Sequence, residues 1–373
     1  MCYDISSGNG AGVCAARQAG TGSVPPLLRK DGIVMPINKA VLAAMRAATR
    51  LRPDIKESYK AQRVAEDVSA KLILPDPRCR IDNAEAIMPD GYAVPLRVFT
   101  PLDIDFSLVT GLKVTEDSRG TILFFHGGGW VNGSVDFYID ACTTMAIKLE
   151  RRVVSVDYRR APEHRFPQAP EDCYEVARQL YAGELLADVD ADNLVLFGDS
   201  AGGNLAAAVS LMARDRGEFL PHTQMLLYPA TYNDHNPATS FFDSVRENGE
   251  DYLLSSRDIM GYMELYASSP EDLHNPYFAP LIEPDLSNQP RTLVISAEYC
   301  PLRDEGETYA QRLADDGNVV ACYRVLDAVH GYFLYPSVLG LVRDTYRIIK
   351  HFLDGDELAE GDEKAWLEIL GTD

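Results

Sequence analysis

Seven short apolar segments that alternate with helical stretches constrain the fold of this 373-residue chain more than any other feature. Several are apolar at almost every position, as is typical of strands buried on both faces of a parallel sheet. Strand–helix–strand alternation predicts an α/β fold with a mostly parallel central sheet, flanking helices and right-handed crossovers. The expected strands are AVPLRVF (93–99), TILFFH (121–126), RRVVSVDY (151–158), NLVLFG (193–198), TQMLLYP (223–229), RTLVISAE (291–298) and VVACYRVL (319–326). The expected helices between the later strands cover about 137–150, 168–187, 202–216 and 304–315.

The remaining sequence divides around this α/β region, which we expect to span 81–355. Residues 1–24 are rich in Gly, Ala and Ser, with almost nothing to bury, and are predicted to be disordered. Residues 25–80 contain apolar residues at helical spacing and are predicted to form a helical segment over the sheet. Residues 234–276 interrupt the alternation and are interpreted as a second covering insertion. The acidic residues 356–373 are expected to form a solvated helix or extension.

Charge and cysteine content exclude several classes of protein. The chain has 35 Lys and Arg against 56 Asp and Glu, a formal charge of −21, which argues against nucleic acid and anionic membrane surfaces as partners. No segment approaches the roughly 18–20 apolar residues of a membrane span, and the first residues lack the apolar core of a secretion signal. The seven cysteines are widely spaced without a C-x-x-C pair, so we expect neither disulfides nor a metal site, and a cytoplasmic location.

The segment Gly198-Asp199-Ser200-Ala201-Gly202 is a G-x-S-x-G motif. An apolar strand leads into it and a helix-forming stretch, GGNLAAAVSLMARD, follows it. Glycines on both sides of a serine permit the sharp strand-to-helix turn that exposes its hydroxyl group above a sheet. Ser200 is therefore a candidate nucleophile; the alternative is an ordinary turn with a capping serine.

A second motif, His126-Gly127-Gly128-Gly129-Trp130, follows the strand TILFF. Consecutive glycines free backbone N–H groups to point into a cavity, where they can stabilise the charge of a tetrahedral intermediate. We expect Gly127, Gly128 and the N–H of Ala201 to supply these donors. A flexible turn or a phosphate loop is the alternative, but no Lys or G-x-G-x-x-G unit accompanies the glycines.

An activated serine needs a base within hydrogen-bond reach. Among the seven histidines, only His330 follows a late strand in a loop before a helix. Its position and its place in the chain order predict that His330 is this base.

Six motifs in order now resemble one family: HGGGW, VVSVDYRRAPEHRFPQAPEDCY, GDSAGGN, HNPYFAPL, LVISAEYCPLRDEGETYAQRL and VHGYF. Together they resemble the bacterial hormone-sensitive-lipase family of α/β-hydrolases, in its GDSAG branch, from about residue 85 to 350. The resemblance implies an α/β-hydrolase fold with a helical cap. It also implies cofactor-free hydrolysis of small carboxylic esters of short to medium acyl chain through an acyl-enzyme. Relatives commonly dimerise through the last strand and helix, which makes a homodimer an expectation.

One residue departs from the family pattern. The resemblance places the third member of the catalytic triad, an aspartate, at position 300, where this chain has Cys300. The acid normally holds the imidazole in the correct tautomer and stabilises the imidazolium, and disabling it in serine proteases lowers turnover about 10⁴-fold. A neutral thiol is a weak hydrogen-bond partner, whereas a thiolate could replace the carboxylate.

Four explanations stay open for this cysteine. Cys300 replaces the acid with reduced efficiency; another carboxylate has taken its role; an aspartate was deliberately changed to cysteine; or catalysis has been lost. The carboxylates near in sequence or at strand ends are Asp234, Glu298, Asp304 and Asp327. A silent small-ligand binding protein on the same fold, and an amide or formamide hydrolase, are therefore kept as alternatives to a carboxylesterase.

Substrate selectivity is expected to reside in the two covering segments. Their bulky apolar residues are Met45, Phe241, Phe242, Tyr252, Leu253, Leu254, Met260, Tyr262, Met263 and Tyr266. Most are expected to form the core of the cap, with a few lining an acyl pocket, since such pockets are mainly apolar. As pocket residues we predict Trp130, Phe241, Tyr252 and Leu253.

Overall fold

A computed structural model describes residues 39–74, 76–107, 111–116, 119–355 and 366–370 of the chain. The predicted disorder of 1–24 and most of the predicted acidic extension lie outside these ranges. Within them, no helix is both long and apolar enough to cross a bilayer.

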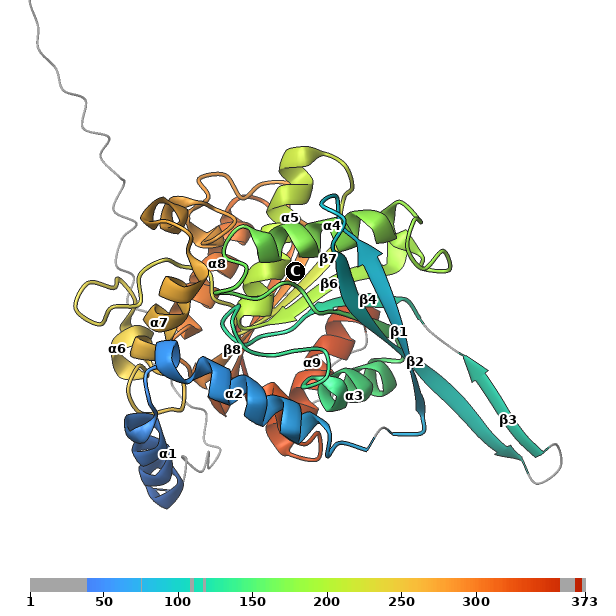
Figure 1. The fold of residues 1–373 in the computed structure, drawn as a ribbon, viewed down its shortest axis with the longest axis horizontal. Coiled ribbons are helices and arrows are strands. Elements are labelled where there is room, and N and C mark those ends of the chain that lie inside the picture. Colours follow the sequence, from blue (N-terminus) through green and yellow to red (C-terminus); the bar gives the residue numbers. More distant parts are fainter. Residues whose placement is uncertain (1–38, 75, 108–110, 117–118, 356–365, 371–373) are drawn as a thin grey trace, which may run out of the picture. The chain divides into compact units, whose positions relative to one another are not determined.

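The strands of the described residues form one sheet in the order β1-β2-β5-β4-β6-β7-β8-β9-β10, with β3 paired to β2 (Figure 1). The six strands from β5 to β9 in this order are parallel, while β1, β2 and β10 join antiparallel at the two edges. The strands are β1 (Cys79–Ile87), β2 (Ala93–Ser107), β3 (Gly111–Glu116), β4 (Thr121–Phe125), β5 (Arg152–Val156), β6 (Leu194–Asp199), β7 (Thr223–Leu227), β8 (Arg291–Tyr299), β9 (Val320–Val329) and β10 (Trp366–Leu370). The α/β-hydrolase fold and its mostly parallel sheet are thus confirmed.

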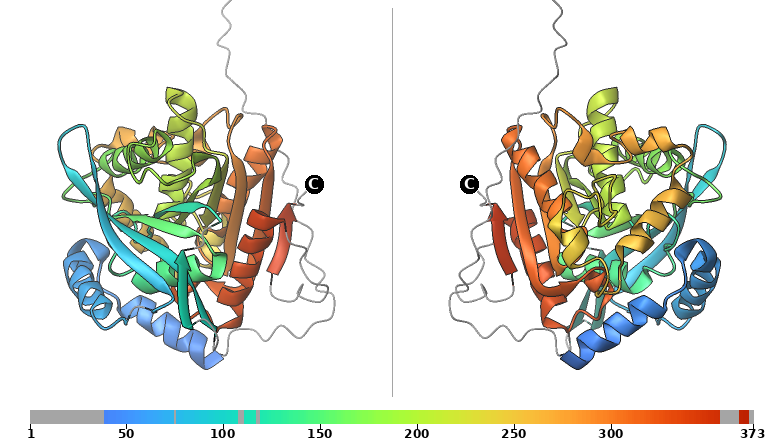
Figure 2. Two further views of the ribbon diagram at one scale, coloured as in Figure 1. Left: turned by 90° about the vertical axis from the view of Figure 1, so that its right-hand side faces the viewer. Right: turned by 90° about the vertical axis from the view of Figure 1, so that its left-hand side faces the viewer.

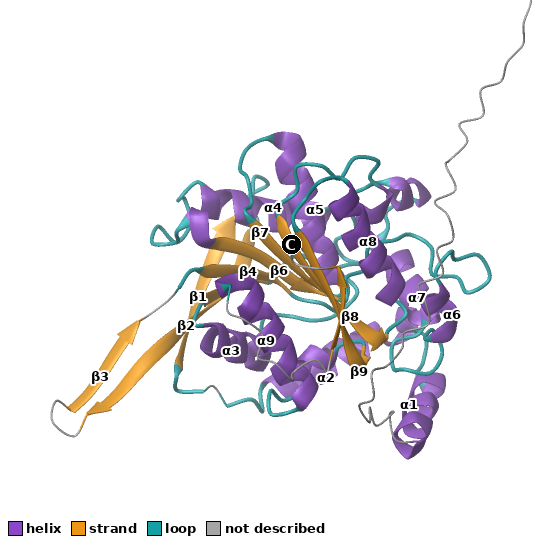
Figure 3. Ribbon diagram, turned by 180° about the vertical axis from the view of Figure 1, so that it is seen from behind, coloured by secondary structure: helices purple, strands orange, loops and turns teal. Residues whose placement is uncertain are grey.

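Helices cover both faces of the sheet (Figure 3). One face carries α3 (Ile139–Leu149) and α9 (Gly340–Asp354), and the other carries α4 (Gln168–Tyr181), α5 (Ala201–Arg216) and α8 (Arg303–Asp315). The central strands β4 and β6 are buried at every position, because both of their faces pack against helices. This packing explains the continuous apolar runs in their sequences.

The cap consists of two pieces that are far apart in the sequence. The N-terminal piece contains α1 (Lys39–Leu51) and α2 (Ile55–Ala70), and the insertion after β7 contains α6 (Asp243–Glu247) and α7 (Ser256–Tyr266). Helix α2 packs against α7, where Gly261 allows close approach because a Cβ there would lie 2.4 Å from a methyl group of Ile55. Each of the two segments that the sequence suggested as a covering thus contains helices among the described residues.

Three edge strands were not predicted from the sequence. Strand β1 is buried only at Cys79 and Ala86, and β3 extends β2 into a hairpin (Figure 1). Strand β10 lies inside the segment expected to be a solvated helix or extension, and instead pairs with β9 at the edge of the sheet (Figure 2). Edge strands lack the two-sided burial that makes central strands conspicuous in the sequence.

Candidate active site

Ser200 lies at the turn between β6 and α5, with its backbone at φ 55° and ψ −120°. This sparsely populated conformation is held by tight packing of the two motif glycines. A Cβ on Gly198 would lie 2.1 Å from the carbonyl oxygen of Gly202, and one on Gly202 would lie 1.9 Å from that of Phe125. Only glycine fits at either position, so the motif produces the strained turn that presents the serine hydroxyl.

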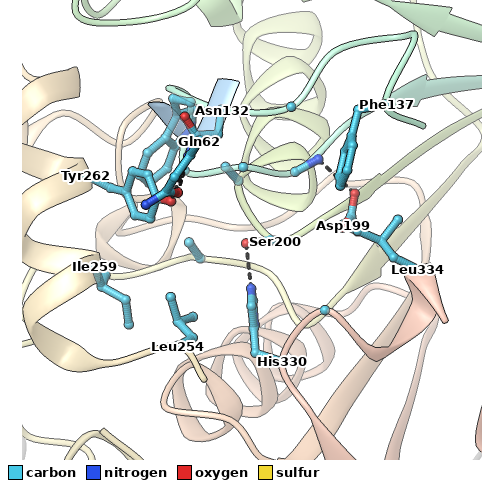
Figure 4. A pocket seen from close by; sticks show the side chains of 18 of the residues that line it. Gln62, Asn132, Phe137, Asp199, Ser200, Leu254, Ile259, Tyr262, His330 and Leu334 are labelled. Atoms are coloured by element: carbon cyan, nitrogen blue, oxygen red, sulfur yellow. Dashed lines mark hydrogen bonds between the residues drawn. The ribbon is translucent and has the colours of Figure 1, made fainter. Parts of the chain in front are cut away.

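His330 follows β9 and faces Ser200 across the cavity (Figure 4). Its Nε2 lies 2.9 Å from Ser200 Oγ, and its ring meets that of Tyr228 edge-on, with centroids 4.8 Å apart. Burial lowers the pKa of His330 to about 3. The imidazole is therefore neutral at ordinary pH, which is the form that can accept a proton from a serine hydroxyl.

Cys300, at the end of β8, faces the other nitrogen of the same imidazole. Its Sγ lies 3.1 Å from His330 Nδ1 and accepts a hydrogen bond from the N–H of Leu302 at 3.3 Å. The side chain is fully buried, and this burial raises the pKa of the thiol well above its ordinary value. Position 300 therefore places a thiol, whose ionisation burial disfavours, against the second nitrogen of His330.

Three of the four carboxylates considered as substitutes accept hydrogen bonds from other groups. Glu298 accepts the N–H of Asp327 at 2.8 Å, and Asp304 accepts the N–H of Ser244 at 2.7 Å. Asp234 accepts the N–H of Asn236 at 3.0 Å. The group that faces His330 Nδ1 is thus the thiol of Cys300 rather than any of these carboxylates.

The glycine loop after β4 lies beside Ser200, but its first donor is already used. The N–H of Gly127 donates to Asp199 Oδ1 at 2.8 Å, while Tyr138 Oη donates to Asp199 Oδ2 at 3.0 Å. Gly127 was therefore wrongly predicted as a free donor: its N–H fixes the loop to the residue before the nucleophile. Burial raises the pKa of Asp199 to about 6 despite these hydrogen bonds.

Three other backbone N–H groups remain available near Ser200. Among the described residues, none of the hydrogen bonds involves the N–H of Gly128 or of Gly129. Ala201 is the first residue of α5, so its N–H has no acceptor within the helix. All three residues line the cavity in front of Ser200. Gly129 was not predicted, although it is the third glycine of the same motif.

The cavity has a volume of about 210 Å³ and is lined by both cap pieces and by the loops that carry Ser200 and His330. Its apolar side chains include Phe137, Leu254, Ile259, Leu302 and Leu334, and its polar ones include Gln62, Glu66, Asn132 and Tyr262 (Figure 4). Leu254 and Tyr262 belong to the apolar set expected from the sequence. Gln62 and Glu66 carry no local sequence signal, because a polar residue on a helix ordinarily faces water. Asn132, in the loop after β4, carries none either.

Of the four predicted pocket residues, only Trp130 lines the cavity. Its indole stacks on Tyr266 at a centroid distance of 4.5 Å and is 4% exposed, so most of it belongs to the core. Phe241 is 79% exposed, and Tyr252 stacks on Tyr299. The backbone N–H of Leu253 donates to Thr49 Oγ1, in α1, at 3.1 Å. The cavity is not lined by these last three residues: Phe241, before α6, is exposed, and Leu253, after α6, is hydrogen-bonded to α1.

The described residues contain no group of three or more His, Cys, Asp or Glu side chains arranged to hold a metal ion.

Comparison with known proteins identifies the family. The profile of the alpha/beta hydrolase fold family matches residues 122–334. An arylesterase of Saccharolobus solfataricus is 36% identical over 284 residues, which cover 74% of this chain and 86% of that protein. An ethyl acetate hydrolase of Pseudomonas putida is 30% identical over 303 residues, covering 80% and 91% respectively.

Solved structures agree with this assignment. A hyperthermophilic esterase from the archaeon Pyrobaculum calidifontis superposes with a TM-score of 0.74 at 32% identity, covering 86% of this chain and 99% of that one. The fold, the ordered motifs and these relatives lead to one conclusion: the chain belongs to the hormone-sensitive-lipase-like family of α/β-hydrolases, the family of the carboxylesterases it resembles.

Proposed function

We propose that this protein is a serine carboxylesterase that hydrolyses small esters of short to medium acyl chain through an acyl-enzyme on Ser200. The observation that carries the proposal is the 2.9 Å contact between Ser200 Oγ and His330 Nε2 at the floor of a small, largely apolar cavity. The esterase relatives named above support the same reaction class.

In the proposed reaction, Ser200 Oγ attacks the ester carbonyl carbon while His330 Nε2 takes its proton. The carbonyl π-bond electrons move to oxygen, and the N–H groups of Gly128, Gly129 and Ala201 stabilise the resulting oxyanion. Collapse of this intermediate expels the alcohol, which receives the proton from His330. Water then attacks the acyl-enzyme in the same way, and Ser200 and the carboxylic acid are released.

Cys300 limits this mechanism at the base. For Nε2 to accept a proton, Nδ1 must carry its own hydrogen and donate it to a partner. A neutral thiol is a weak acceptor, and when its S–H donates to Nδ1 the hydrogen of the imidazole moves to Nε2. In that tautomer His330 cannot act as the base, so we expect a functional but slow enzyme.

The test is release of p-nitrophenol from p-nitrophenyl butyrate by the full chain, by Ser200→Ala and by Ser287→Ala as a matched control in a surface loop. The proposal requires a rate above background in the full chain, the same rate in Ser287→Ala and none in Ser200→Ala. Equal turnover in Ser200→Ala would overturn the assignment of the nucleophile. A folded full chain with no turnover, even after Cys300→Asp, would favour a silent binding protein.

A further inference from the structure

One side of the Ser200 cavity is polar although the rest is apolar. Gln62 and Glu66 of α2, Asn132 of the loop after β4 and Tyr262 of α7 all line it, and we refer to these four residues as the polar wall. Gln62, Asn132 and Tyr262 lie together on one side of Ser200, whereas Phe137 and Leu334 lie on the other (Figure 4). The wall therefore faces one arm of any ester whose carbonyl lies at Ser200.

The amide groups of the polar wall have a fixed direction. The carbonyl oxygen of Asp54 can only accept, so the hydroxyl of Ser58 donates to it at 2.9 Å. Ser58 Oγ then accepts from Gln62 Nε2 at 3.0 Å, and this leaves Gln62 Oε1 to accept from Asn132 Nδ2 at 2.8 Å. A backbone carbonyl at the start of α2 thus orients both amides.

Asn132 Oδ1 has no hydrogen-bond partner among the described residues but is buried, whereas two other groups of the polar wall retain hydrogen-bonding capacity. Tyr262 Oη accepts from Asn132 Nδ2 at 3.2 Å, but its own hydrogen has no acceptor in the described part of the chain. Glu66 Oε2 accepts the N–H of Gly133 at 3.0 Å, while Oε1 has no hydrogen-bond donor within the described ranges. The wall therefore offers one free donor and one free acceptor to a ligand.

The charge around Glu66 indicates which ligand group suits this pair. Burial raises the pKa of the Glu66 carboxyl group, and the nearby guanidinium groups of Arg160 and Arg63 oppose this shift by stabilising the carboxylate. Their positive charge disfavours an ammonium group at the same place. A neutral hydroxyl group matches the site because it both donates, to Glu66 Oε1, and accepts, from Tyr262 Oη.

We propose that the polar wall binds a hydroxyl group of the substrate, so that the preferred substrates are short esters with a hydroxyl group a few atoms from the scissile carbonyl. This inference rests on the proposed function and deepens it. An ester without the hydroxyl group would displace water from Tyr262 and Glu66 and leave both unpaired. We expect the hydroxylated ester to bind at least about 10-fold more tightly, since one bond involves a charged partner.

The test compares three esters on one carbon skeleton: propyl butyrate, 1-glyceryl butyrate and propyl 3-hydroxybutyrate. Their dissociation constants are measured by ligand-observed NMR titration with Ser200→Ala protein, which leaves the esters intact. The two hydroxylated esters distinguish a hydroxyl group on the alcohol side from one on the acyl side. The inference requires tighter binding of one of them and loss of that preference in the Ser200→Ala protein that also carries Tyr262→Phe.

Two controls keep the test decisive. Tyr277→Phe removes a hydroxyl that is hydrogen-bonded to Asp215 outside the cavity, and it should leave the preference unchanged. Glu66→Gln, which removes the charge but keeps the side-chain size, should weaken the preference even where Tyr262→Phe impairs folding. Equal affinities for all three esters, or a preference that survives both variants, would overturn the inference.

The outcome is separate from that of the proposed function, because binding is measured without turnover. If the chain prefers a hydroxylated ester but hydrolyses none of the esters, the proposed role of the polar wall is supported and the proposed esterase function is contradicted. Hydrolysis of all three esters with equal affinities would do the reverse.

Discussion

Replacing Cys300 with aspartate is expected to raise kcat for p-nitrophenyl butyrate by about 10³-fold. The thiol sulfur lies 3.1 Å from His330 Nδ1, so a carboxylate at this position would contact the same nitrogen. The N–H of Leu302, which now donates to Sγ at 3.3 Å, would hold the second carboxylate oxygen. The backbone around position 300 thus already offers a donor for the missing acid.

The magnitude follows from the charge that the base acquires in the transition state. A carboxylate about 4 Å from an imidazolium stabilises it by about 4 kcal/mol at an effective dielectric constant of about 20. This energy corresponds to about 10³-fold in rate, somewhat less than the roughly 10⁴-fold loss caused by disabling the acid in serine proteases. The neutral thiol of Cys300, whose pKa is raised by burial, supplies none of this term.

The assay is the initial rate of p-nitrophenol release by the full chain, Cys300→Asp and Cys300→Asn. The asparagine is nearly the same size as aspartate but carries no charge, so it should not accelerate the reaction. Thermal unfolding of all three proteins shows whether each is folded. A folded Cys300→Asp protein with an unchanged rate, or equal gains in both variants, would refute the argument that position 300 lacks a charge that His330 needs.

Three further predictions concern pH and packing. Burial lowers the pKa of His330 to about 3, so the imidazole is neutral above that pH. In the unmodified chain, kcat/KM should therefore show no loss from protonation of His330 between pH 5 and 7.5. In Cys300→Asp the new carboxylate raises the pKa of His330, so kcat/KM should fall toward the acid end of this range. If kcat/KM of the unmodified chain falls below about pH 6, and the same fall is seen in Asp199→Asn, this prediction is contradicted. The pKa of Asp199 is raised from 3.8 to about 6, so its contribution to stability is present below pH 3.8 and is lost as pH rises through 6. Asp199→Asn should therefore raise the free energy of unfolding, measured in urea, by at most about 3 kcal/mol at pH 7.5 and change it little at pH 4. Equal effects at both pH values would refute the raised pKa of Asp199. Gly202→Ala should destabilise the fold by more than about 2 kcal/mol, since its Cβ would lie 1.9 Å from a carbonyl oxygen of β4. Gly340→Ala should be tolerated, because its Cβ would lie 3.8 Å from the end of the Arg343 side chain, an ordinary van der Waals contact. Similar unfolding midpoints for the two variants would contradict this.

The central strands and the nucleophile turn could be predicted because their physical constraints are local. Strands β4 and β6 need apolar residues at every position, and the turn at Ser200 needs glycine where a Cβ would strike backbone. His330 was predicted as the base from its position in a loop between a late strand and a helix, together with its place in the chain order. The strands and the turn each depend on a few consecutive residues.

The remaining features depend on contacts between distant segments. Gly127 lost its predicted role because its N–H is bonded to Asp199, 72 positions later. Phe241 was predicted to line the pocket because it is large and apolar, yet hydrophobicity does not determine which way a loop faces. Gln62 and Glu66 resemble ordinary polar residues of a surface helix until α2 is packed over the cavity.

The most direct test of the account is covalent labelling of the full chain with a p-nitrophenyl alkylphosphonate, which a nucleophilic serine attacks with release of p-nitrophenol. Mass spectrometry of the intact protein and of its peptides then locates the adduct. The account predicts one phosphonyl group on Ser200, formed faster in Cys300→Asp and absent from both Ser200→Ala and His330→Ala. An adduct on another residue, or equal labelling of Ser200→Ala, would contradict the assignment of Ser200 as the nucleophile.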